Sequence, residues 1–235
     1  MLIGILKTQG ATMQFCFLFS TTTIIFTISI FVVSTIVGFL TEKYRKKRFK
    51  NEKNSALMIL LHPISCIVAF LIVQLFYDPN KTFQMQTLQL CSLFIILLHA
   101  SYCDIKEREV DDYISIMLML VGLFGLNLTT FATAIEPFLG ALICFVLFFI
   151  VLVTAKSVPI GGADIKIATA CALTLGAFHG LLAILFGLIF ALVGTAVKSR
   201  IKKEKQKSFP FIPYYFAGVI VSLLLPFESY LFPVV

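Results

Sequence analysis

The chain has 235 residues, of which 59% are apolar and only 13% are charged. Soluble domains carry about 25% charged residues, so this composition and the mean hydropathy of +0.99 exclude an ordinary soluble enzyme and indicate a polytopic membrane protein. The net charge of +7 suits basic cytoplasmic loops better than nucleic-acid binding, and no nucleic-acid partner is expected. None of the six cysteines forms a CxxC pair, so buried thiols are expected rather than disulfides or a zinc site.

Apolar stretches follow one another along the chain, and about 20 such residues cross a bilayer as a helix. The stretches are Phe15–Leu40, Ala56–Tyr77, Leu88–Cys103, Ile114–Phe131, Pro137–Thr154, Ile165–Phe178, Leu181–Val197 and Phe211–Leu231. The first is too long for a signal peptide and its basic run follows it, so we expect a retained helix. Small residues fill the sixth, which predicts close packing against other helices. The fold class that follows is all-α, a bundle of about eight transmembrane helices.

The positions of lysine and arginine set the orientation of these helices. Apart from Lys7 and Lys81, every one of them falls in the alternate connections 41–54, 103–113, 155–166 and 198–208. The sequence therefore predicts that these four connections are cytoplasmic and that both termini lie outside. We divide the chain into 1–87, a two-helix segment with a basic loop, and 88–235, a six-helix core.

Two aspartates lie where an apolar stretch meets a cytoplasmic connection. Asp104 follows the third stretch and Asp164 precedes the sixth, so they are 60 residues apart in sequence but share one predicted depth. An ionisable residue at a membrane span is costly and indicates function by default. Two adjacent carboxyls that share one proton can act as general base and general acid, because like charges in contact do not both ionise. The pair predicts acid–base chemistry that requires neither a metal nor a cofactor, and such chemistry is sufficient to hydrolyse a peptide bond.

The first aspartate lies in Asp104-Ile-Lys106-Glu-Arg108-Glu-Val110, which has the form D-x-[KR]-x-R-x-[IV]. This stretch resembles the first motif of the type IV prepilin peptidases, the GxGD class of aspartic membrane proteases. The similarity is closest to the archaeal prepilin and preflagellin peptidases. Within it, Lys106 and Arg108 are the basic positions that support the motif.

The second aspartate lies in Gly161-Gly162-Ala163-Asp164-Ile-Lys166. This stretch resembles the second motif of the same family, G-x-G-D-x-K, with Ala163 at a glycine position. The two glycines before Ala163 let an extended substrate backbone approach closely. Lys166 either orients the substrate and tunes the aspartates, or anchors the helix at the inner face. The helix dipole near Asp164 favours its ionised form.

The resemblance covers about Leu88 to Val235, including the proline-containing entry to the last stretch at Pro210–Tyr214. It implies that Asp104 and Asp164 are catalytic, at the cytoplasmic face of the cell membrane. It implies substrates that are small pilin-like or archaellin-like precursors, with a basic leader before an apolar helix. Bacterial relatives with methyltransferase activity carry four cysteines in the first cytoplasmic loop, and none is present in 41–54. We therefore expect neither zinc nor methyl transfer.

Other interpretations of the same residues are open. Four acids follow the first aspartate and are candidates to attract a basic leader, although a solvated surface is the plainer interpretation: they are Glu107, Glu109, Asp111 and Asp112. Each catalytic candidate has a plain interpretation as a helix cap, and His99 is expected to be a packed histidine. A proton- or cation-coupled transporter is the main alternative function, and an inactive assembly factor is a third. A transporter would usually show internal repeats, and none is visible.

Overall fold

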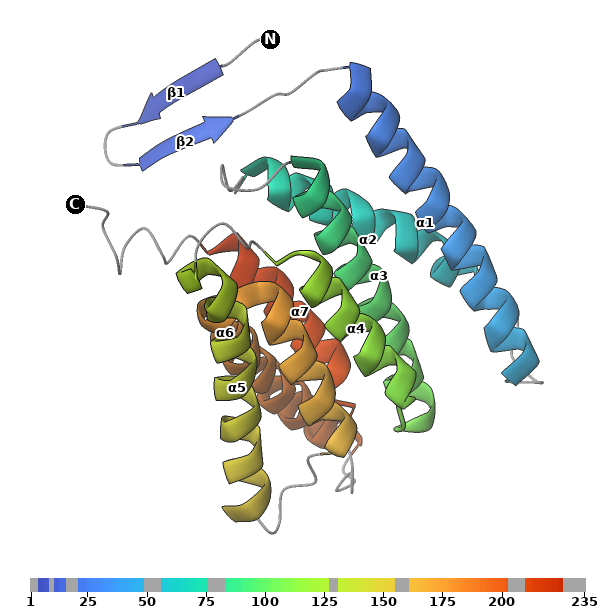
Figure 1. Ribbon diagram of the computed structural model, residues 1–235. Coiled ribbons are helices and arrows are strands. Elements are labelled where there is room, and N and C mark those ends of the chain that lie inside the picture. Colours follow the sequence, from blue (N-terminus) through green and yellow to red (C-terminus); the bar gives the residue numbers. More distant parts are fainter. Residues whose placement is uncertain are drawn as a thin grey trace. The chain divides into compact units, whose positions relative to one another are not determined.

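The computed structural model describes residues 4–8, 11–15, 21–48, 56–75, 83–126, 131–154, 161–202 and 210–225. These residues form one short hairpin and the helices α1 to α7 (Figure 1). The chain divides into two compact units, Met1–Leu98 and His99–Val235. Parts of the predicted connections 41–54, 155–166 and 198–208, and the end of the last predicted helix, lie outside the described residues.

The hairpin at the start of the chain was not expected from the sequence. Strand β1, Gly4–Thr8, pairs antiparallel with β2, Ala11–Phe15. Two residues separate the strands in sequence, the second of them Gly10, and such a spacing is typical of the tightest hairpins. The all-α prediction therefore holds for the described residues beyond Phe15 and is incomplete before it.

The first unit contains α1, Thr21–Arg48, α2, Ala56–Leu75, and most of α3, Phe83–Glu107. Helix α1 packs against α2. It begins later than the predicted stretch and continues through Arg48, so residues 41–48 of the predicted basic loop are helical. Lysine, arginine and glutamate are good helix formers, and cations near a helix C-terminus interact favourably with its dipole.

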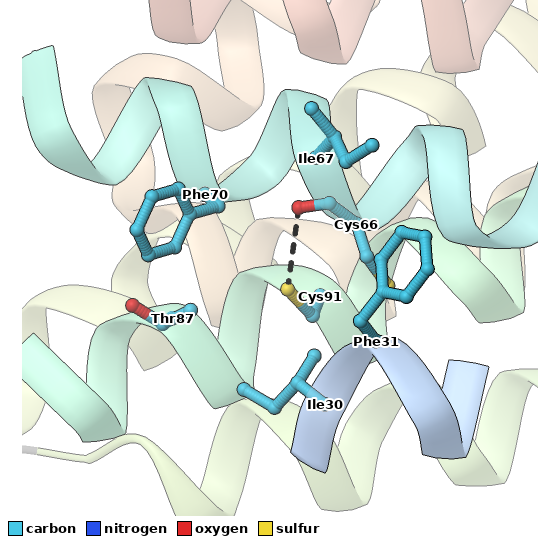
Figure 2. Close-up of a pocket in the computed structure, with 7 residues that line it drawn as sticks. All are labelled: Ile30, Phe31, Cys66, Ile67, Phe70, Thr87 and Cys91. Carbon is cyan, nitrogen blue, oxygen red and sulfur yellow. Dashed lines mark hydrogen bonds between the residues drawn. The ribbon is translucent and has the colours of Figure 1, made fainter. Parts of the chain in front are cut away.

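Helices α1, α2 and α3 surround a small apolar pocket in this unit (Figure 2). It is lined by Ile30, Phe31, Cys66, Ile67, Phe70, Thr87 and Cys91. The thiol of Cys91 donates a hydrogen bond to the Cys66 carbonyl across 3.7 Å, and both cysteines are free and buried, as predicted. The volume of about 70 Å³ is far below the several hundred Å³ of small-molecule sites. The pocket is therefore a packing gap between helices.

The second unit contains the last turns of α3 from His99, followed by four more helices. These are α4, Asp112–Phe124, α5, Phe131–Thr154, α6, Gly162–Lys202, and α7, Ile212–Leu224. Helix α6 packs against α4, α5 and α7. Its small residues Ala168, Cys171 and Ala172 are at most 1% exposed, which confirms the predicted close packing of the sixth apolar stretch.

Helix α6 is broken at Gly176, which has φ 78° and ψ 177°. A Cβ placed on Gly180 would lie 2.9 Å from the Cβ of Ala172, although residues eight apart in a straight helix are separated by about 12 Å. The chain therefore reverses at Gly176, and α6 consists of two antiparallel helices (Figure 1). They correspond to the sixth and seventh predicted stretches.

Glu136 on α5 completes this break. The second half of α6 begins with backbone N–H groups that have no intrahelical partner, and the Ala177 N–H donates to Glu136 Oε1 at 2.8 Å. Gly140 allows α5 to come this close, because a Cβ there would lie 2.5 Å from the Ala177 nitrogen. Glu136 thus acts as a cap supplied by a neighbouring helix.

Two stretches among the described residues are long and apolar enough to cross a membrane, judged by length and composition. They are Met85–Glu107 and Gly162–Val197, and the remaining apolar helices are shorter. The second stretch contains the reversal at Gly176. The existence of long apolar helices agrees with the predicted membrane class, while eight spans and the location of the termini remain predictions.

Candidate active site

Asp104 lies in the last turn of α3, which continues past the predicted end at Cys103 to Glu107. The residue is only 7% exposed. Its Oδ2 accepts a hydrogen bond from the backbone N–H of Ile212 at 2.9 Å. Ile212 is the first residue of α7, so the carboxylate lies at the N-terminus of a helix that begins 108 residues later in the chain. Its charge is thereby favourably placed with respect to the dipole of α7.

Arg108 ends α3 in a left-handed conformation, with φ 61°, and is alone among the described non-glycine residues in having a positive φ. Its N–H donates to the Asp104 carbonyl at 3.2 Å. A left-handed residue is a common way to end a helix, although glycine usually occupies the position. The Arg108 guanidinium is close enough for its charge to act on the Asp104 carboxylate. Lys106, the other basic residue of the motif, is exposed.

Asp164 lies in the first turn of α6, which begins at Gly162. Its Oδ2 accepts a hydrogen bond from the Gly161 N–H at 3.0 Å, and its own N–H donates to the Gly161 carbonyl at 3.1 Å. The carboxylate therefore reaches back to the residue before the helix, as the acid of a capping box does. It is the third helical residue rather than the N-cap that the plain interpretation assumed.

The negative charge of Asp104 acts on the Asp164 carboxyl, after the larger effects of burial and of the Gly161 hydrogen bond. Asp104 lies on α3 and Asp164 on α6, and the two residues are 60 positions apart in sequence. Each carboxyl has its Oδ2 held by a backbone N–H, from Ile212 in one case and Gly161 in the other. A carboxylate has two oxygens, so holding one leaves the second for other partners.

The small residues before Asp164 leave space at the start of α6. A Cβ on Gly162 would meet no atom within 4 Å, whereas one on Gly161 would lie 3.3 Å from Asp164 Oδ2. Neither glycine has a positive φ, so open space rather than backbone conformation distinguishes them here. Ala163 is a helical residue of the first turn, a position that alanine favours, and the departure from the glycine pattern causes no strain.

Lys166 forms an ion pair with Asp112, with 2.7 Å between Nζ and Oδ1. The pair joins the first turns of α6 and α4, and both side chains are more than half exposed. This intramolecular role was included in neither interpretation of Lys166. Among the other candidate leader contacts, Glu109 is exposed, while Glu107 and Asp111 are half-buried.

His99 is half-buried and contacts two neighbouring side chains. Its Nε2 lies 3.3 Å from the Tyr113 hydroxyl and 3.8 Å from the Cys103 thiol. Within the part of the chain that the structure describes, no three His, Cys, Asp or Glu side chains are arranged to hold a metal ion. A metal-free reaction remains a prediction from the chemistry of paired carboxyls.

Comparisons with known proteins bear on the same segment. Residues 91–196, which include both aspartates, match the sequence model of the type IV leader peptidase family. The chain is also 32% identical over 135 residues to the preflagellin peptidase of Methanococcus voltae, an alignment that covers 55% of this chain and 51% of that protein. The chain thus spans about half the length of this curated relative. No solved structure gives a significant match. The segment that carries both aspartates is thus similar to the type IV leader peptidase family and to a preflagellin peptidase.

Proposed function

We propose that this chain is an aspartic endopeptidase of the cell membrane that removes the basic leader from pilin-like or archaellin-like precursors. The observation that carries the proposal is that Asp104 and Asp164 each accept a hydrogen bond from a backbone N–H and that the charge of Asp104 acts on Asp164. The match to the type IV leader peptidase family and the similarity to a preflagellin peptidase support this class of substrate.

The reaction follows from the pair. One ionised carboxylate takes a proton from a water molecule, whose oxygen attacks the scissile carbonyl carbon, while the protonated partner donates its proton to the carbonyl oxygen. When the C–N bond breaks, the leaving nitrogen takes up a proton and the shared proton returns to the pair. Two carboxyls that share one proton titrate as one unit, so neither Asp104 nor Asp164 is assigned a fixed role.

The surroundings of Asp164 suit an extended substrate. The space beside Gly162 is open, which lets a peptide backbone pass close to the carboxyl. The acids of the α3–α4 connection attract a basic leader over a distance of several Å. Asp112 is already paired with Lys166, so a leader lysine that binds Asp112 replaces an existing cation rather than meeting an isolated acid.

The predicted topology completes the proposal. Eight spans with both termini outside place Asp104 and Asp164 together at the cytoplasmic face. In this arrangement residues 88–235 form the peptidase core and 1–87 a two-helix segment whose basic loop faces anionic lipid. Cleavage then occurs where the leader of a precursor emerges from the bilayer.

The proposal is tested by incubating the chain in liposomes with a synthetic precursor that has a lysine-rich leader followed by an apolar helix. Mass spectrometry of the products locates the cleaved bond, and a precursor with a glutamate-rich leader is the matched control. We expect cleavage at the leader boundary of the basic precursor, with EDTA present throughout. If no leader-bearing precursor is cut while the liposomes show proton or cation flux that depends on Asp104, the transporter alternative replaces the peptidase.

A further inference from the structure

We propose that the backbone N–H of Ile212 is the positioning group that orients the carboxylate of Asp104 for catalysis. The inference rests on the proposed function and concerns a contact between α3 and α7 that no local sequence motif contains. Both ends of the contact are buried, with Asp104 7% and Ile212 1% exposed. At 2.9 Å the hydrogen bond has the usual length of a backbone donor to a carboxylate.

The sequence of the α7 entry leaves one N–H of its first turn for this purpose. A helix begins with N–H groups that have no intrahelical acceptor. In α7 the N–H groups of Tyr214 and Tyr215 both donate to the Phe211 carbonyl at 3.0 Å. Pro213 has no N–H at all. Ile212 therefore presents the remaining donor within the helix, and Asp104 is its acceptor at 2.9 Å. The backbone N–H of Phe211, one residue before the helix, also acts on this carboxylate but more weakly.

The start of α7 has no side-chain cap from its own N-cap residue. The residue that precedes the helix is Phe211, whose side chain makes no capping hydrogen bond. Instead, its ring packs edge-on against Phe148 of α5 and lies 5.9 Å from the ring of Tyr215. These contacts fix the start of α7 in the second unit, and the fixed N–H then fixes the carboxylate.

The two aspartates differ in how they are held. Asp164 is bonded by a residue three positions earlier, in a contact that is exposed and local. Asp104 depends on an element from the far end of the chain. A catalytic group misplaced by about 1 Å loses roughly 100-fold in rate. The position of the α7 N-terminus therefore affects the reaction through Asp104, although the Ile212 N–H does not contact the substrate.

The test replaces single backbone amides by esters in the full chain. Incorporating the α-hydroxy analogue of isoleucine at position 212 deletes the N–H while keeping the side chain and backbone angles. The matched control is the same replacement at Tyr214, which deletes a hydrogen bond of similar length in the same turn but leaves Asp104 untouched. Ile212→Val, which keeps the N–H, is the conservative variant. Proline at 212 is unsuitable because Phe211 is in the helical region, which a following proline disfavours.

We expect the ester at 212 to lower kcat about 10- to 100-fold on the lysine-leader precursor, with KM changed by less than about twofold because substrate groups are not touched. The Tyr214 ester and Ile212→Val should keep kcat within about threefold of wild type. Equal losses in the two esters would overturn the proposal, because they would reflect the helix start alone. An unchanged kcat at 212 would overturn it as well.

A second measurement does not require the ester protein to fold. In wild type, hydrogen exchange at the Ile212 amide should be slow, and Asp104→Ala should accelerate it at least about 10-fold, since the amide loses its acceptor, while exchange at Tyr214 changes little. Equal exchange rates at Ile212 in the two proteins would show that Asp104 does not accept this hydrogen bond, and the proposal would be wrong. The proposed function fails separately, if wild type cleaves no leader-bearing precursor or if a folded Asp104→Asn or Asp164→Asn variant keeps full activity.

Discussion

Gly176 is the position at which one added methyl group tests the fold of α6 most sharply. Alanine there must adopt φ 78° and ψ 177°, a region that glycine alone occupies readily, at a cost of about 1–3 kcal/mol. Its Cβ would lie 2.5 Å from Glu136 Oε1, so Ala177 loses its capping acceptor, which adds about 1 kcal/mol. We expect Gly176→Ala to lower the free energy of unfolding by about 2–4 kcal/mol.

Thermal unfolding in detergent, followed by the loss of helical circular dichroism, measures this effect. In a chain of this size each kcal/mol corresponds to about 2–4 °C, so Tm should fall by roughly 5–15 °C. Gly162→Ala adds the same methyl group where no atom lies within 4 Å and should leave Tm unchanged. In a Glu136→Ala protein, which already lacks the cap, Gly176→Ala should lower the free energy of unfolding by about 1 kcal/mol less than in wild type. A Gly176→Ala protein that melts with wild type would refute the reversal of the chain at this glycine.

Three further predictions concern the candidate site. Arg108→Gly replaces an arginine in the left-handed conformation, so the free energy of unfolding should rise by up to about 1 kcal/mol. The same change should lower kcat, because a charge that acts on Asp104 is lost. Denaturant titration measures the stability and initial rates measure kcat; a fall in stability would contradict the first expectation. Gly162→Ala should raise KM for the lysine-leader precursor without affecting folding, and an unchanged KM would exclude substrate passage over this glycine. A double-mutant cycle of Asp112→Asn and Lys166→Met should give a coupling below about 1 kcal/mol that vanishes in high salt; a larger, salt-independent value would contradict the exposed geometry of the pair.

Helical segments and their packing were readable from the sequence because they depend on local composition. The small residues of the sixth apolar stretch predicted a closely packed helix, and Ala172 is fully buried. The break between the sixth and seventh stretches was expected after Phe178 and occurs at Gly176, because the positive φ there needs glycine and cannot be located by hydropathy. The extension of α1 through Arg48 was missed because charged residues were taken as loop, although they favour helix.

The contacts that shape the candidate site were not readable in this way. The motifs pointed to Asp104 and Asp164, but the hydrogen bond from Ile212 joins residues 108 positions apart. Its donor is a backbone N–H, which every residue except proline has, so the residue type does not reveal it. The only signal was the proline-containing entry to the last helix. Glu136 likewise gave no indication that it caps Ala177, and the Lys166–Asp112 pair required knowledge of how α4 and α6 approach each other.

The central claim is that Asp104 and Asp164 act together, and single-turnover cleavage of the lysine-leader precursor in liposomes tests it most directly. Wild type, Asp104→Asn and Asp164→Asn are compared with Glu109→Gln, which neutralises an exposed acid of the same region. The enzyme is saturated with precursor so that attraction of the leader does not limit the rate, and helical circular dichroism verifies that each variant is folded. The account predicts that both aspartate variants lose at least about 1,000-fold in rate, as expected for removal of a general acid or base, while Glu109→Gln stays within about threefold of wild type. Full activity in either folded aspartate variant would contradict the two-carboxyl mechanism.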